Sequence, residues 1–230
     1  MTRLASRAGG LGAGSGELFA SAAGNGLLDR PEHVTLWQHE GCRPMTSNQA
    51  YTLFETQSGT CAIAWSDEGV SGFRLPGDDP KQTERAMRRR FRDAALAPPT
   101  AEIAAAIDRV RAYFAGERSD FSDLPLDLSA QTDLFRQIYL ATRRLGWGST
   151  TTYGALAGEL ELGPAGAWTI GQAMAKNPIP LIIPCHRVLA AGRKIGGFSA
   201  PGGSDSKLRM LELEGVELPD TSPAQQSFVF

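Results

Sequence analysis

The sequence predicts an α+β fold in which a small antiparallel sheet with helices precedes a mostly helical C-terminal part. Three β-rich runs, YTLFET, TCAIAWS and GVSGFRL, lie within residues 51–75 and are separated by the turn signals QSGT and DEG. Apolar residues at helical spacing follow at 79–94 and 100–115. Three more helical segments are expected beyond residue 130.

Length and composition set the class of protein. The 230 residues suffice for one large or two small domains, and 42% hydrophobic with 21% charged residues is typical of soluble globular proteins. No run of about 18 apolar residues is present, as a membrane helix needs, so no membrane partner is expected, and the N-terminus lacks the apolar core of a secretory signal. We therefore expect a cytoplasmic protein, and a monomer because no interface pattern is visible.

Composition shifts predict the domain boundaries. Residues 1–30 are rich in Gly, Ala and Ser and are expected to form a flexible tail. An N-terminal α/β domain is assigned to 45–125 and a C-terminal domain to 126–216, with the Pro-containing segment FSDLPLDLSA at the boundary. A second tail is expected at 217–230.

Charge and cysteine usage constrain the partners. The net charge of −2 does not favour nucleic acid, but residues 131–215 hold nine Lys and Arg against six Asp and Glu, so this part can approach phosphates. Three cysteines without a CxxC pair predict neither a zinc ribbon nor a disulfide framework. No cofactor is expected. A metal site built from Cys42, Cys61, His33 or His39 is left open.

The helices of the C-terminal part suggest a DNA-binding motif. A helix is predicted over 132–145, and GSTTTYG caps a short helix over 154–160. A turn with Pro164 at the first helical position leads into a helix over 165–176, which completes a helix-turn-helix signature. On this last helix one stripe is expected to pack inward (Ala167, Ile170, Gly171 and Met174), while small or polar residues form an open face. By contrast, MRRRFR in the helix at 79–94 is interpreted as a solvated face.

Cys185 and His186 form the candidate chemical centre. The apolar run IPLII and Pro184 predict that Cys185 stands at the end of a stiff strand. Neighbouring residues of a strand point to opposite sides, so the two side chains would meet only through a bend or a bridging water. A nearby histidine favours the thiolate, which is the nucleophile. An inert buried cysteine is the alternative interpretation.

These residues stand in a longer pattern that resembles the 6-O-methylguanine-DNA methyltransferases. The match covers about 126–215 and runs through TTYGALAGEL, Asn177-Pro178, PCHRV, GGFS and KLRMLELEG, with a looser match in the preceding β-rich region. The resemblance implies a ribonuclease H-like N-terminal domain and a winged-helix-like C-terminal domain. It implies DNA repair, in which an alkyl group moves irreversibly from a flipped guanine of double-stranded DNA to the protein.

The resemblance also implies the catalytic residues. Cys185 matches the alkyl acceptor, His186 the base that activates it through a water, and Glu214 the carboxylate that orients this histidine. Asn177 matches a residue that ties the helix pair to the active-site turn. Tyr153 matches a donor to the guanine ring that helps to extrude the base.

Substrate and DNA contacts are implied in the same way. Val188, Ser199 and Lys207 match residues that line, close or border the guanine pocket. The second helix of the pair enters the minor groove in this family, with contacts expected from Gly166, Ala167, Trp168, Thr169 and Gln172. Trp168 stands where the family has an arginine that fills the gap left by the flipped base. Trp168 is interpreted either as an aromatic wedge between bases or as a hydrophobic residue packed on the neighbouring domain.

Three other functions remain open on the sequence. A protein that recognises alkylated guanine with little or no transfer is the first alternative. A helix-turn-helix regulator with a structural cysteine is the second, and it would bind a specific sequence without a preference for lesions. A Cys-His hydrolase is the third, and no oxyanion-hole motif supports it.

Overall fold

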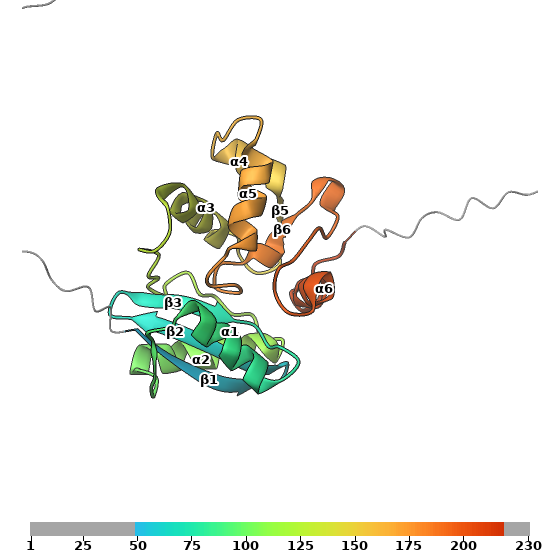
Figure 1. Ribbon diagram of the computed structural model, residues 1–230. Helices are drawn as coiled ribbons and strands as arrows, with labels where there is room; N and C mark the ends of the chain where they lie inside the picture. Colours follow the sequence, from blue (N-terminus) through green and yellow to red (C-terminus); the bar gives the residue numbers. More distant parts are fainter. Residues whose placement is uncertain (1–48, 219–230) are drawn as a thin grey trace, which may run out of the picture. The chain divides into compact units, whose positions relative to one another are not determined.

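The computed structural model describes residues 49–218 (Figure 1). The predicted tail at 1–30, most of the predicted tail at 217–230, and Cys42, His33 and His39 of the possible metal site lie outside these residues. Within the described part of the chain, no helix is both long enough and apolar enough to span a membrane.

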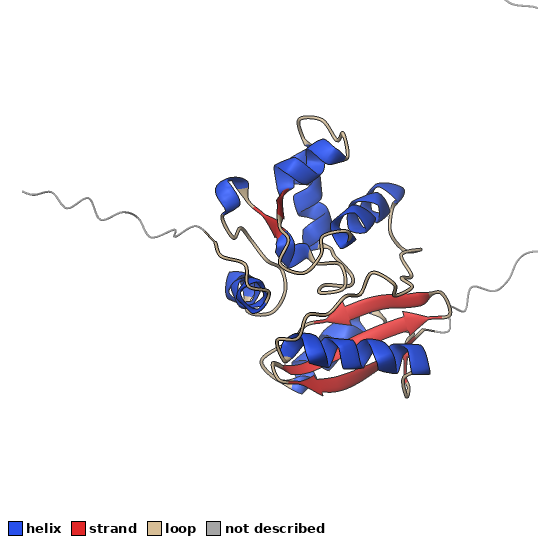
Figure 2. Cartoon of the chain, turned by 180° about the vertical axis from the view of Figure 1, so that it is seen from behind, coloured by secondary structure: helices blue, strands red, loops and turns tan. Residues whose placement is uncertain are grey.

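The predicted antiparallel meander is confirmed and forms most of a four-stranded sheet in the order β3-β2-β1-β4 (Figure 2). The strands are β1 (Ala50–Thr56), β2 (Gly59–Ser66), β3 (Gly69–Arg74) and β4 (Ala95–Leu96). Gly59 and Gly69 adopt φ of +114° and +129°, which other residues rarely reach, so each glycine allows the tight turn before its strand. The two-residue β4 pairs in parallel with β1 and was not predicted, because it is too short to show a period.

Two helices cover opposite faces of this sheet, α1 (Pro80–Arg90) and α2 (Ala101–Phe114). Successive residues of a strand alternate between faces. On β2, Cys61 and Ile63 belong to the cluster that contains α2, whereas Ala62 and Ala64 pack with Met87 of α1.

The predicted helical C-terminal part is also confirmed. It contains α3 (Asp133–Arg143), α4 (Tyr153–Glu159), α5 (Gly166–Ala175) and α6 (Gly203–Leu213). Two-residue strands β5 (Thr151–Thr152) and β6 (Val188–Leu189) pair in parallel beside α4. Side-chain oxygens of Thr132 and Thr152 accept backbone N–H groups at the starts of α3 and α4, which fixes where these helices begin.

The inward face of α5 differs from the prediction. Its buried residues are Gly166, Ile170, Ala173 and Met174. Gly166, predicted on the open face, is buried. Its packing is so close that a Cβ there would lie 2.8 Å from the Cβ atoms of Ala157 and Leu162. Ala167, predicted to pack inward, is exposed. Pro164 precedes the helix instead of occupying its first position.

Backbone contacts join the sheet to the segment that holds the candidate site. The Phe73 amide on β3 donates to the Pro178 carbonyl at 3.0 Å, and the Val70 amide donates to Pro125 at 2.9 Å. One hydrophobic cluster contains Phe73 of the sheet as well as Ile170 of α5. The boundary near residue 126 stays a prediction.

Candidate active site

Residues 177–184 form a tight turn, and the predicted strand at IPLII is therefore wrong. Leu181 adopts φ of +75°, and the Ile183 amide donates to the Ile179 carbonyl at 2.8 Å. Asn177 clamps the turn: its Nδ2 donates to the Ile183 carbonyl at 2.8 Å, and its Oδ1 accepts the Ile179 amide at 3.0 Å. Proline removes the N–H that a strand ladder needs, so the apolar side chains are buried in a turn instead.

Cys185 follows this turn and begins a short 3₁₀ helix, η1 (Cys185–Arg187). It is 5% exposed, yet it lines two adjoining cavities of about 270 Å³ and about 400 Å³. Other residues lining the smaller cavity come from α4, α5 and the segment before α6: Tyr153, Gly171, Met174, Ala175, Gly197, Phe198 and Ser199. The sulfur is therefore buried but reachable.

His186 and Glu214 lie together in the interior, as the resemblance implies. His186 Nε2 is 2.7 Å from Glu214 Oε1, and both side chains are fully buried. The Arg187 guanidinium donates to both carboxylate oxygens at 2.8 and 2.9 Å, so Arg187 is an ion-pair partner of Glu214. Tyr113 Oη donates to Glu214 Oε1 at 2.9 Å, and the Gly148 amide donates to Oε2 at 3.1 Å.

This network sets the charges of the pair. Burial raises the pKa of Glu214, but hydrogen bonds from His186 and Arg187 outweigh burial and lower it to about 2, so the carboxylate is ionised. Burial lowers the pKa of His186 against the opposing pull of Glu214, so the imidazole is neutral at neutral pH. A neutral ring that donates from Nε2 to Glu214 carries a lone pair on Nδ1. That Nδ1 atom is buried without a hydrogen-bond partner.

The thiol is protonated in the resting site. Burial raises the pKa of Cys185, and a hydrogen bond from Asn177 and the charge of Lys207 oppose this rise. Burial lowers the pKa of Lys207 to about 8, and the Cys185 charge opposes that change. Lys207 Nζ donates to the Val188 carbonyl at 2.7 Å and lies 5.8 Å from the centre of the Tyr153 ring. Lys207 is thus held beside Cys185 and Tyr153, which both line the smaller cavity.

The remaining predicted substrate contacts fall into two groups. Tyr153, the first residue of α4, and Ser199 both line the smaller cavity with Cys185. Val188 lies fully buried in β6 and lines neither of the two cavities that reach Cys185. It is connected to the site by its carbonyl, which accepts a hydrogen bond from Lys207.

The outer face of α5 carries the predicted DNA contacts. Trp168 is 70% exposed, so the interpretation that it packs on the neighbouring domain is wrong. Ala167 is exposed beside it, and Thr169 is half-buried, with its hydroxyl donating to the Ala165 carbonyl at 3.2 Å. Gln172 is also half-buried. Gly166 is the one predicted contact that the fold places inside.

Sequence reasoning missed the residues that support Glu214 from a distance. Tyr113 lies on α2, 101 residues from its partner, in a segment that was predicted only as a helix with apolar residues at helical spacing. The Gly148 amide carried no sequence signal. Gly197 and Phe198 of the cavity lay within the GGFS match but were not singled out. Across residues 49–218, no group of three or more His, Cys, Asp or Glu could hold a metal ion.

Comparisons with known proteins identify one family. Residues 50–128 match the model of the 6-O-methylguanine DNA methyltransferase ribonuclease-like domain, and residues 133–216 match the DNA binding domain of the same family. A DNA base-flipping protein of Thermus thermophilus is 41% identical over 121 residues, which are 51% of this chain and 79% of that protein. A methylated-DNA–protein-cysteine methyltransferase of Mycobacterium bovis is 38% identical over 122 residues, 53% of this chain and 71% of that protein.

Solved structures give the same result. The crystal structure of Mycobacterium tuberculosis OGT in complex with DNA is 30% identical, with a TM-score of 0.58, and covers 72% of this chain and 92% of its own. The crystal structure of the O6-methylguanine methyltransferase from the same organism is 29% identical, with a TM-score of 0.59, and covers 75% and 96%.

Proposed function

The chain belongs to the 6-O-methylguanine DNA methyltransferase family, and from this membership and the site geometry we propose that it repairs DNA by moving an alkyl group from guanine to Cys185. The single observation that carries the proposal is the position of Cys185, which lines a cavity and directly precedes His186, the partner of Glu214. The protein is thus a methylated-DNA–protein-cysteine methyltransferase that acts once per molecule.

His186 is the base that takes the thiol proton. Its neutral ring offers the unpartnered Nδ1 lone pair, and a water between Sγ and Nδ1 carries the proton. The imidazolium that results is stabilised by the ionised Glu214, whose own proton affinity is too low to compete. Because the pKa of the resting thiol is raised, ionisation accompanies substrate entry instead of preceding it.

The transfer itself is an in-line displacement. Sγ of Cys185 forms a bond to the alkyl carbon while the bond between that carbon and O6 of guanine breaks, and the electron pair stays with the base. Guanine then takes up a proton from Tyr153, which lines the same cavity, and the proton held by the His186 imidazolium returns through water to the Tyr153 oxygen, so the thiol proton ends on the base and the protein regains its starting charge. A thioether does not hydrolyse, and no second turnover follows.

The base must leave the duplex to reach this cavity, at a cost of a few kcal/mol. The helix-turn-helix of α4 and α5 docks in the minor groove, with Ala167, Trp168, Thr169 and Gln172 toward the DNA. The exposed indole of Trp168 supports the interpretation that it wedges between bases in place of the flipped nucleotide. Ser199 closes the cavity over the base.

Lesion recognition without transfer is the second candidate, and the relative named a DNA base-flipping protein keeps it in view. The retained Cys185, His186 and Glu214 favour transfer. The cytoplasmic location, the monomeric state and the absence of a cofactor stay predictions.

Intact mass spectrometry tests the function. The protein is incubated with duplex DNA that carries one 6-O-methylguanine, and a gain of one methyl group on Cys185 is expected. The same DNA with guanine at that position is the control. Lesion-specific binding without a mass gain would establish the second candidate instead.

The role of Trp168 is tested by Trp168→Ala. Stacking on a base contributes about 1–3 kcal/mol, so we expect affinity for lesion-bearing duplex to fall roughly five-fold to a hundred-fold. Leu140→Ala, which removes another exposed hydrophobic side chain from the helical part, is the matched control. Equal affinities of Trp168→Ala and the unaltered protein for this duplex would refute the proposal that Trp168 wedges between bases.

A further inference from the structure

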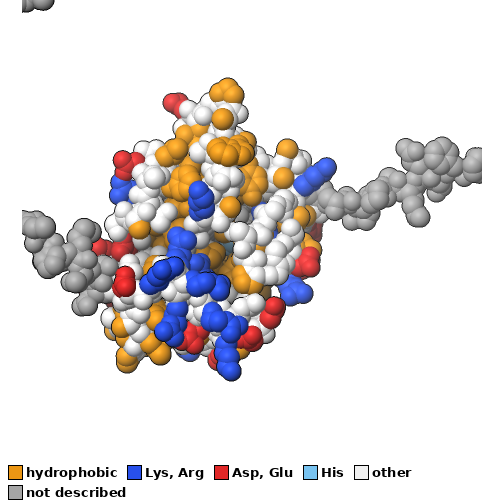
Figure 3. Space-filling view, viewed as in Figure 1, with side chains coloured by type: hydrophobic (Ala, Val, Ile, Leu, Met, Phe, Trp, Pro, Cys, Tyr) orange, Lys and Arg blue, Asp and Glu red, His pale blue; other side chains and the backbone are white. Residues whose placement is uncertain are grey.

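The second half of α1 carries an excess of positive charge. Arg85, Arg88, Arg89 and Arg90 are all exposed, and Figure 3 shows Lys and Arg side chains gathered on the face over this helix. Of the four, only Arg88 has an acidic partner among the described residues, Glu84 at 3.8 Å. Arg85 and Arg89 are four positions apart, a spacing at which like charges destabilise a helix.

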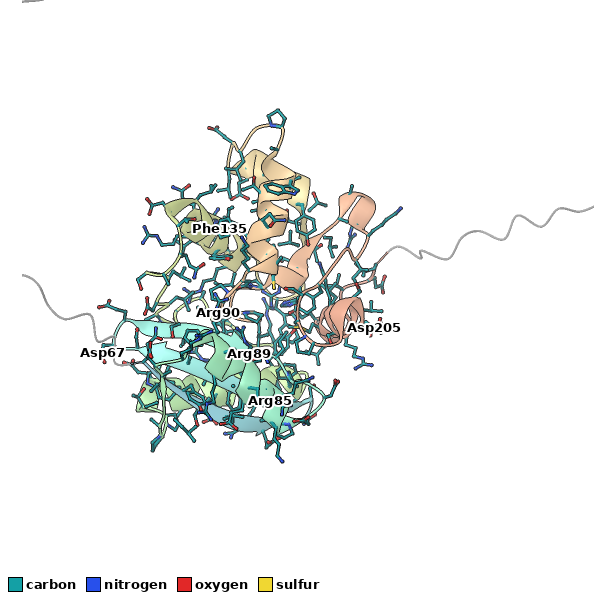
Figure 4. All side chains as sticks on the ribbon, viewed as in Figure 1. Asp67, Arg85, Arg89, Arg90, Phe135 and Asp205 are labelled. Carbon is teal, nitrogen blue, oxygen red and sulfur yellow. The ribbon has the colours of Figure 1, made fainter. Side chains whose placement is uncertain are left out.

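This charge continues to the edge of the candidate active site. The cavity of about 400 Å³ that reaches Cys185 is also lined by Arg74 of β3, Arg90 of α1 and Lys176 at the end of α5. Arg90 and Lys176 also line a neighbouring hollow of about 430 Å³. In Figure 4, Arg85, Arg89 and Arg90 lie along α1, with Arg90 nearest to the helical part. We call Arg74, Arg85, Arg89, Arg90 and Lys176 the basic patch.

The patch is crowded without acidic partners. Burial lowers the pKa of Arg74 to about 10, and the charges of Arg90 and Arg89 lower it further in the same direction. No salt bridge to any of the five residues exists within 49–218. The helix dipole favours cations in the last turn of α1, which accounts for Arg88, Arg89 and Arg90. The dipole of α5 likewise favours Lys176 at its C-cap, but no helix dipole accounts for Arg74 on β3.

We propose that the basic patch is a second DNA-binding surface, which holds backbone phosphates of the strand that delivers the damaged base to Cys185. The proposal rests on the proposed function and adds to it a role for the N-terminal domain in DNA binding. The arginines of MRRRFR are exposed, as the interpretation of a solvated face expects, and the proposal adds a binding role to that face.

Geometry and chemistry favour a nucleic-acid strand over a single anion. Arg85 to Arg90 spans about 7.5 Å along the helix, which compares with two nucleotide steps of about 3.4 Å each. Arg74, Arg90 and Lys176 of the patch also line a cavity that the acceptor residue Cys185 lines. Arginine binds phosphate through a planar fork of donors, and phosphate contacts position a duplex without reading its sequence.

The test compares two charge-matched double variants. Arg89→Gln with Arg90→Gln removes two charges from the patch, whereas Arg111→Gln with Arg118→Gln removes two exposed charges from α2 and the segment after it. Affinity for duplex DNA is measured between low and physiological salt. Loss of two phosphate contacts lowers affinity about tenfold at low salt and makes the slope of log K against log salt shallower by about two.

Two further measurements separate this proposal from the proposed function. In single-turnover transfer, the patch variant still moves the methyl group to Cys185 but needs more DNA for half-maximal rate. If the proposed function fails, the unaltered protein shows no transfer at any DNA concentration. Arg89→Lys with Arg90→Lys keeps the charge and restores most of the salt slope. The proposal is overturned if the slope of log K against log salt is the same in the patch variant and the unaltered protein. It is also overturned if the α2 control loses as much affinity as the patch variant. Either result would be expected if the patch bound RNA or an acidic protein instead of DNA.

Discussion

The two buried thiols of the described residues, one in the sheet and one in the helical part, differ in their surroundings. Cys61 on β2 is fully buried, and burial raises its pKa to about 12. Burial raises the pKa of Cys185 as well, but Asn177 and Lys207 oppose the rise and two cavities reach the sulfur. A thiol that is buried without a cavity or a neighbouring base therefore stays protonated and unreactive. Access and a neighbouring base distinguish the thiol that can react.

The largest expected effect is loss of transfer on removal of one sulfur. Cys185→Ala should abolish the mass gain from lesion-bearing duplex, because no other described thiol is reachable. Cys61→Ala should keep the full gain and lose only about 1 kcal/mol of stability through a small cavity. Intact mass spectrometry and urea unfolding decide both. A methyl group found on Cys61 would end the comparison.

The second effect is on the base. Glu214→Gln removes the charge that stabilises the His186 imidazolium, so the transfer rate should fall by about 10²–10⁴. It also leaves Arg187 unpaired in the interior, which costs about 3–5 kcal/mol of stability. Glu212→Gln, on the exposed side of α6, is the control. Rates are compared at a temperature where circular dichroism shows both variants folded, and equal rates would show that the carboxylate charge is not needed.

A smaller effect tests whether the two regions are coupled. Tyr113→Phe removes a buried hydrogen bond from α2 to Glu214, so the free energy of unfolding should fall by about 1.5–3 kcal/mol. Tyr51→Phe removes a longer and part-buried bond to Glu84, at 3.4 Å, and should cost less. Urea denaturation measures both. If the two costs were equal, the Tyr113 bond would not join the regions energetically.

The last effect appears in the pH dependence of stability. The folded pKa of Lys207 is about 8, below its usual 10.5, so between these values the unfolded chain binds more protons. The free energy of unfolding should therefore gain a rising contribution from about pH 8 to 10.5. Lys207→Met should lack this contribution when denaturation curves of the two proteins are compared across that window. Parallel curves would mean that Lys207 is not desolvated beside Cys185.

Local signals predicted much of the fold. The helices predicted over 79–94 and 100–115 start within a residue or two of α1 and α2, whose N-caps are Asp79 and Thr100, and turn signals separated the strands. The family motif assigned the Cys185, His186 and Glu214 roles, and the last two lie within hydrogen-bond distance.

Packing and long-range contacts decided the rest. The run at 179–183 has the composition of a strand, but prolines and the Asn177 clamp turn it back on itself. Periodicity treated the small residues Ala167 and Gly171 as apolar, whereas close helix packing selects Gly166. The Tyr113–Glu214 bond spans 101 residues, a separation over which local pattern carries no information.

The packing of α5 on α4 has a practical consequence for engineering. Gly166, Ile170, Ala173 and Met174 anchor the helix, while its opposite side, with Ala167 and Trp168, bears little of the packing. Substitutions there leave the scaffold intact, so α5 is an element whose outward side chains can be rewritten by library selection while the reactive centre behind it is retained.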